Sequence, residues 1–167
     1  MQKLVFRSKS NPMANKGLCV LLFVVFLGWA PIVSAAQLCL VDPKSDQEVT
    51  RFDTGEDRTF ALAFIHSVSL TPVRDEYLMQ GAAITQTREI FEAHGAGLPS
   101  FADDIGATGW QFEDGKFILE MQRPLDQMRV RIQEEYKNTL HIAGRDVVLS
   151  QFGYSVLVLR ACSRERK

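Results

Sequence analysis

The stretch FALAFI at residues 60–65 decides the fold class. In an extended chain successive side chains point to opposite faces, so the two phenylalanines and the leucine share one face while the alanines and the isoleucine share the other. A strand that is apolar on both faces is typical of the middle of a sheet or sandwich. We therefore expect this stretch at the centre of a β domain.

Short alternating runs separated by turn residues continue on both sides of this stretch. They predict strands at residues 38–41, 48–52, 73–80, 83–90, 110–112, 117–119, 140–142, 147–149 and 156–159. Asp114-Gly115 is the strongest hairpin signal, because a type I′ turn needs positive φ at both central positions. Residues 125–136 fit helical spacing as well as alternation, and we choose a strand because Arg129 and Arg131 fall on one face. The sequence predicts an all-β domain, an antiparallel sandwich or partly closed barrel of about ten short strands.

The chain divides into a signal peptide at residues 1–36 and a single exported domain at residues 37–167. Four basic residues and no acid precede an uncharged run at residues 17–33, and the small residues Ser34, Ala35 and Ala36 follow. The alternative is a retained membrane anchor, because the run is near the lower limit of about 17–25 residues for spanning a bilayer. The small-residue exit favours cleavage after Ala35 or Ala36. We expect a periplasmic protein, held at the inner membrane only if the leader is retained.

The charge balance excludes one class of partner. The leader carries four of the 19 basic residues, so the remaining 15 face 20 acidic residues and give a net charge near −5. An acidic domain with scattered lysines and arginines has no electrostatic footprint for nucleic acid and no basic patch for anionic lipid. We therefore expect no nucleic-acid partner, and a membrane contact only through a retained leader.

Two cysteines remain after the leader, Cys39 and Cys162, one at each end of the exported domain. In an oxidising compartment such a pair is most simply a disulfide, which would tie the first strand to the last and hold the edges of the fold together. The alternative is two unpaired buried thiols, since sequence alone does not show whether their Cα atoms approach within about 7 Å. A redox or metal role is weaker because there is no Cys-x-x-Cys.

His66 and Ser67 follow the central strand at the point where core meets loop. Glu76 lies in the next predicted strand, and an antiparallel hairpin would bring it back near His66. A carboxylate beside a histidine favours the protonated imidazole, which suits a proton-linked or anion-facing site. The alternative is a histidine at the rim that bonds to its own turn, with Glu76 merely solvated.

A second cluster comprises His94, Gly95, Gly97 and Pro99. Two glycines one residue apart allow backbone turns closed to other residues, and their amide groups can form an anion-binding nest. The alternative is a tight loop that serves packing, stopped by Pro99. The three histidines of the domain lack the short spacing of a zinc site. We therefore assign binding roles to both clusters and expect no catalytic residue, cofactor or metal.

Five motifs together resemble the domain of unknown function family numbered 1850: FIHSV at residues 64–68, TPV at 71–73, EY at 76–77, HGAGLP at 94–99 and LHIAG at 140–144. The resemblance implies a small exported bacterial protein, of a kind often encoded beside TRAP transporters of the TAXI type. It implies a binding module accessory to solute uptake, which contacts the transporter's membrane component, its solute-binding component or a small solute. The alternative is a small hydrolase or metal-dependent enzyme, which requires His66, Glu76 and His94 to converge.

Overall fold

The structure is a computed structural model that describes residues 36–95, 97–99 and 106–162. The expected signal peptide lies outside these residues, apart from its last, Ala36. Within the described part of the chain, no helix has the length and apolarity needed to cross a bilayer.

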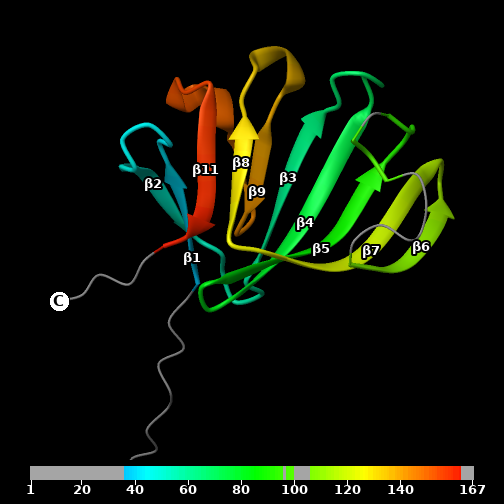
Figure 1. Cartoon of the computed structure of the whole chain (residues 1–167), viewed down its shortest axis with the longest axis horizontal. Coiled ribbons are helices and arrows are strands. Elements are labelled where there is room, and N and C mark those ends of the chain that lie inside the picture. Colours follow the sequence, from blue (N-terminus) through cyan, green and yellow to red (C-terminus); the bar gives the residue numbers. More distant parts are fainter. Residues whose placement is uncertain (1–35, 96, 100–105, 163–167) are drawn as a thin grey trace, which may run out of the picture. The chain divides into compact units, whose positions relative to one another are not determined.

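Eleven strands and two short 3₁₀ helices form the described chain (Figure 1). They are β1 (Gln37–Val41), β2 (Glu48–Asp53), β3 (Thr59–Ile65), β4 (Pro72–Gln80), β5 (Ala83–Phe91), β6 (Ala107–Glu113), β7 (Lys116–Leu125), β8 (Gln127–Arg131), η1 (Glu134–Tyr136), β9 (Thr139–Ile142), β10 (Arg145–Val148), η2 (Leu149–Phe152) and β11 (Val156–Ala161). Each predicted strand is present. Within residues 125–136 the strand chosen over a helix is β8, but residues 134–136 of that stretch form the 3₁₀ helix η1. Asp114 and Gly115 have φ of 50° and 78°, which confirms the predicted hairpin turn.

The strands form two antiparallel sheets, so the sandwich reading of the fold is confirmed and a closed barrel is not formed. One sheet has the order β2-β1-β11-β8, and the other the order β10-β9-β3-β4-β5-β7-β6. In the larger sheet β3 has two strands on one side and four on the other (Figure 1). The expectation of a central position for residues 60–65 therefore holds.

The main core fills the space between the sheets. Leu38 and Leu40 of the four-stranded sheet and Leu62 and Leu140 of the seven-stranded sheet are all 5% exposed or less. Burying a side chain of this size contributes about 1.5–3 kcal/mol. We call the face of each sheet that meets this core the inner face, and the opposite one the outer face.

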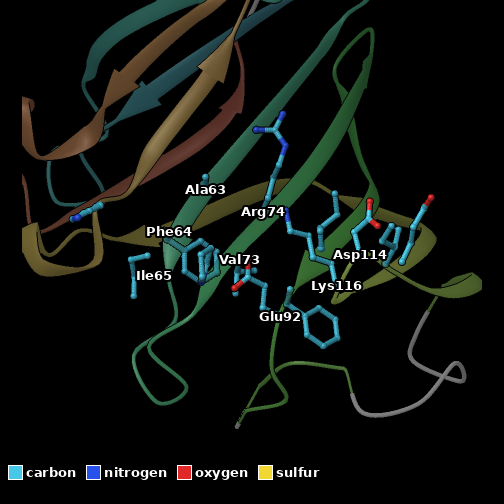
Figure 2. Close-up of a pocket in the computed structure, with 14 residues that line it drawn as sticks. Ala63, Phe64, Ile65, Val73, Arg74, Glu92, Asp114 and Lys116 are labelled. Carbon is cyan, nitrogen blue, oxygen red and sulfur yellow. The ribbon is translucent and has the colours of Figure 1, made fainter.

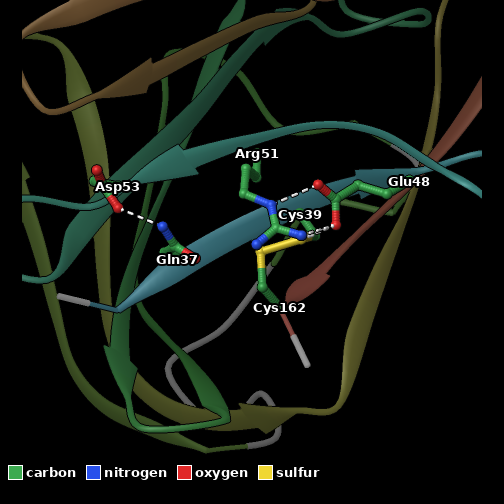
Figure 3. Close-up of a disulfide and its surroundings, with 6 residues drawn as sticks. All are labelled: Gln37, Cys39, Glu48, Arg51, Asp53 and Cys162. Atoms are coloured by element: carbon green, nitrogen blue, oxygen red, sulfur yellow. Dashed lines mark hydrogen bonds and ion pairs between the residues drawn. A yellow bond between two sulfur atoms is a disulfide. The ribbon is translucent and has the colours of Figure 1, made fainter. Parts of the chain in front are cut away.

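A disulfide joins Cys39 of β1 to Cys162 just after β11, with a Cα–Cα distance of 5.0 Å (Figure 3). The expected bond between first and last strands is confirmed. The expectation that it holds the edges is wrong, because β1 and β11 are neighbours flanked by β2 and β8. Glu48 lies 3.1 Å from the Cys39 sulfur and pairs with Arg51 at 2.6 Å. The bond therefore reinforces the middle of the smaller sheet.

Candidate functional site at the His66 end of the sheet

Three connections lie at one end of the seven-stranded sheet. In the antiparallel register Ile65 pairs with Pro72, Phe91 with Phe117, and Glu113 with Lys116. The turn at residues 66–71, the loop that starts at residue 92 and the hairpin at residues 113–116 consequently share this end. We call it the motif end, because both clusters predicted from the sequence fall on it.

His66 organises the turn that follows β3. Its Nδ1 accepts the backbone N–H groups of Val68 and Ser69 at 3.3 and 3.1 Å. The backbone closes the same turn, since His66 N–H donates to the Thr71 carbonyl and Leu70 N–H donates to the His66 carbonyl, both at 2.9 Å. An Nδ1 that accepts two N–H groups carries no proton, so the neutral ring holds its proton on Nε2. Buried and bonded in this way, His66 fixes the shape of the turn.

Gly95 lies directly against the His66 ring. A Cβ at this position would stand 2.7 Å from His66 Cε1 and 3.0 Å from Nδ1, closer than side chains tolerate. Gly97 is needed for a different reason, because its φ of +90° is disfavoured for residues with a Cβ. The two predicted clusters therefore meet, with one glycine providing space and the other providing backbone freedom.

His94 belongs to a neighbouring aromatic cluster. Its ring centroid is 4.4 Å from that of Phe117 and 5.8 Å from that of Phe91, and the ring lies nearly parallel to Trp110. Its Nδ1 lies 3.3 Å from the carbonyl oxygen of the buried Pro99, which closes the loop. His94 and Pro99 thus shape the loop.

Glu76 lies away from the motif end. It pairs with Ala61, five residues before His66, so about 16 Å of strand separates the two positions. It sits on the outer face, where it contacts Arg74 at 2.9 Å and Arg88 at 3.5 Å. The expected approach of Glu76 to His66 is therefore wrong, and the constellation required for the hydrolase reading is not assembled.

The neighbouring residue, Asp75, supplies the carboxylate on the inner face. It pairs with Leu62, and with His66 and Ser67 it lines a cavity of about 590 Å³ between the sheets. The Tyr77 hydroxyl donates to its Oδ2 at 3.3 Å. Burial raises the pKa of Asp75 to about 6, although hydrogen bonds from Tyr77 and Gln86 and the charge of Arg123 oppose the shift. In return, burial and the Asp75 carboxylate raise the pKa of Tyr77.

Sequence reasoning missed Asp75, although a signal was present. It alternates with Val73 and Tyr77, and an acid between apolar residues of one face is a charge directed into the core. The opposite wall of the cavity includes residues of β8, together with Tyr136 and Asn138. A carboxyl with a pKa of about 6 beside a cavity of this size has the features of a contact for a polar solute.

The motif end also presents apolar side chains to solvent. Val68 and Leu70 are 65% and 69% exposed, and both belong to the turn that His66 holds. Leu70 has a φ of +56°, a conformation that costs a leucine roughly 1–2 kcal/mol. The turn thus keeps two aliphatic side chains outside in a strained backbone.

Among the described residues, one group has the spacing of metal ligands: Cys39, Glu48 and Cys162. Its two sulfur atoms are bonded to each other. The thiolates that a metal would need are absent in this state.

Comparison with known proteins identifies a family. A family model described as Domain of unknown function (DUF1850) matches residues 60–149. No curated protein and no solved structure matches the chain. The matched range contains β4 to β10, β3 except its first residue, and the motif end, whereas both cysteines of the disulfide lie outside it.

Proposed function

This chain belongs to the DUF1850 family, and we propose that it is an exported binding module whose contact surface is the motif end. Its partner in this proposal is a component of a TAXI-type TRAP transporter, either the solute-binding component or the membrane component. Support for export comes from the amino-terminal sequence. Support for the transporter comes from the resemblance of the five motifs.

The contact between His66 and Gly95 is the observation that carries the proposal. It joins two motifs that lie far apart in the sequence into one surface. Beside it, Val68 and Leu70 stay exposed in a turn that is fixed by hydrogen bonds. Single exposed apolar residues are ordinary, but two of them on one turn that hydrogen bonds hold fixed form a pre-organised apolar contact, which lowers the ordering cost of binding.

The position of Ala36 bears on where a retained leader would be attached. Thr54 N–H donates to the Ala36 carbonyl at 3.0 Å, and Gly55 lies near Ala143, so these residues mark the end of the sheet opposite the motif end. A retained leader would hold that opposite end at the membrane. The contact surface proposed here would then lie at the end of the domain that is not attached to the leader.

A pull-down with matched variants tests this proposal. The chain is used as bait for detergent-solubilised membranes and periplasm of the source cells, and captured proteins are identified by mass spectrometry. We expect the unaltered chain to recover a transporter component and the variants Val68→Ser and Leu70→Asn to lose it. Val148→Ser is the control, because Val148 is 46% exposed and lies on β10, which β9 separates from β3 and its turn.

Two outcomes would count against the proposal. If the unaltered chain recovers no transporter component, the assignment of the partner fails. If both turn variants recover as much as the control, the assignment of the surface fails. Asparagine tolerates positive φ well, so Leu70→Asn is expected to fold and its result remains interpretable.

A small solute of the transporter is the other partner in the proposal, and the cavity lined by Ser67 and Asp75 is its place. Amide chemical shifts of the labelled protein, followed while the solute is added, provide the test. Changes confined to residues around this cavity would support the assignment, and changes elsewhere would contradict it.

A further inference from the structure

The outer face of the seven-stranded sheet carries an apolar row with one cation in it. Cross-strand pairing aligns the row Thr139, Ala63, Arg74, Ile90 and Ile118. Three of these side chains are aliphatic, and Arg74 stands between Ala63 and Ile90. Both neighbours of Arg74 in the row are apolar. Because one of them, Ala63, is small, there is room for a ligand next to the charge of Arg74.

A second row, one step further from the motif end, is ionic. Arg74 Nε lies 2.9 Å from Glu76, Glu76 lies 3.5 Å from Arg88, and Arg88 lies 2.7 Å from Glu120. The charges alternate, so Glu76 and Arg88 each have an opposite charge on both sides. Arg74 belongs to the apolar row and is linked to the ionic row through Glu76. Among the described contacts, the Arg74 side chain bonds only through Nε. Its two terminal nitrogens therefore face the surface, and its side chain is 41% exposed.

A cavity of about 470 Å³ opens beside Arg74 (Figure 2). Its floor includes Ala63, Ile65, Ile90 and Ile118. On the other side of Arg74 lies a second cavity of about 410 Å³, lined largely by polar residues that include Glu76, Thr87, His141 and Asp146. Arg74 thus marks the boundary between an apolar and a polar hollow on one face, and the first has the size of a small-molecule site.

The edge of the apolar cavity nearest the motif end has a mixed rim. Lys116 and Lys137 line it together with Glu92, Glu113 and Asp114. These charges largely offset one another, with one acid in excess. Arg74 is the cation that stands in the apolar row itself, and the small excess of acid at the rim disfavours a second negative charge there.

We propose that the outer face binds an organic monocarboxylate with an apolar body. The carboxylate accepts hydrogen bonds from the terminal nitrogens of Arg74, and the body lies over Ile90 and Ile118. A dicarboxylate would place its second charge at the rim, where the acids outnumber the lysines by one, and a neutral alcohol would lack the charge that Arg74 pairs with. This inference does not depend on the proposed function, because the outer face is separate from the turn at residues 66–71.

Binding of octanoate to the full chain tests the inference, with amide chemical shifts as the readout. We expect octanoate to shift the amides of Arg74, Ile90 and Ile118, and octanol and octanedioate to bind at least about fivefold more weakly. Arg74→Gln should weaken octanoate binding by about fivefold or more, as expected for a half-exposed charge-assisted pair. Arg160→Gln is the matched control, because Arg160 is 37% exposed and makes a single ion pair on the other sheet.

A second variant keeps the test interpretable if Arg74→Gln does not fold. Ala63→Leu keeps the arginine and fills the space beside it, so it should also abolish octanoate binding. Equal binding of octanol and octanoate would overturn the inference, as would undiminished binding to Arg74→Gln or to Ala63→Leu. So would shifts that map to the cavity between the sheets, or an absence of shifts at millimolar octanoate.

Discussion

Replacement of Asp75 by asparagine should remove a pH-dependent loss of stability. Burial raises the pKa of the Asp75 carboxyl from 3.8 to about 6 in the folded protein. Between these two values the folded state binds more protons than the unfolded state, so stability falls as the pH rises. The penalty is absent below about pH 3.8 and fully present above about pH 6. A shift of this size corresponds to about 3 kcal/mol at most.

Urea unfolding of the unaltered chain and of Asp75→Asn, at pH 4 and at pH 7, measures this penalty. An asparagine oxygen still accepts the hydrogen bond that Tyr77 donates, but its amide nitrogen replaces the oxygen that accepts from Gln86. Loss of the Gln86 bond lowers stability equally at both pH values, so the difference between pH 4 and pH 7 reports the charge. We expect the free energy of unfolding of the variant, relative to the unaltered chain, to rise by about 2–3 kcal/mol from pH 4 to pH 7.

The control is Asp126→Asn, an exposed carboxyl between β7 and β8, which should change stability little at either pH. If the difference between Asp75→Asn and the unaltered chain is the same at pH 4 and pH 7, the carboxyl is not perturbed in the way described. Asp75 would then not be a group that changes charge near pH 6 in the cavity between the sheets.

Three further changes test the framework around the site. Replacing both Cys39 and Cys162 by serine should lower the free energy of unfolding by up to about 5 kcal/mol, because the bond links positions 123 residues apart; a loss below about 1 kcal/mol in urea would contradict this. Gly95→Ala should cost about 1–3 kcal/mol, and combining it with His66→Ala should recover part of that cost; strictly additive losses would show that the two residues do not press on each other. Leu70→Asn should raise stability by about 0.5–1 kcal/mol in thermal unfolding, since asparagine accepts its φ of +56° more readily; a decrease would mean that the leucine packs against the protein.

Local patterns in the sequence were sufficient for the strands. Alternation located each of them, and Asp114-Gly115 identified its hairpin, because side-chain period and turn chemistry act over a few residues. The pairing of β1 with β11 and of β3 with β9 joins segments far apart in the chain. No local pattern encodes such neighbours, which is why the disulfide was predicted correctly as a bond and incorrectly as an edge clamp.

The candidate site was only partly predictable for a related reason. His66 and Gly95 were identified as residues, but their contact depends on two connections ending at the same side of the sheet. Glu76 was chosen by its distance along the chain, whereas the face of the strand decides which cavity an acid reaches. Successive residues of a strand point to opposite faces, so Glu76 and Asp75 lie on different faces. Asp75 lines the cavity between the sheets, whereas Glu76 lies in the ionic row on the outer face.

The two faces of β3 are apolar for different physical reasons. On the inner face, large residues such as Leu62 fill the core between two sheets. On the outer face, Ala61 is only 3% exposed because longer side chains from the flanking strands, including Glu76 and His141, rise beside it. A small residue between taller neighbours makes a hollow, so apolarity on this face reflects a groove in the surface. Enlarging Ala63 should therefore cost little stability and close the octanoate site, whereas Gly95→Ala should cost stability and leave that site open.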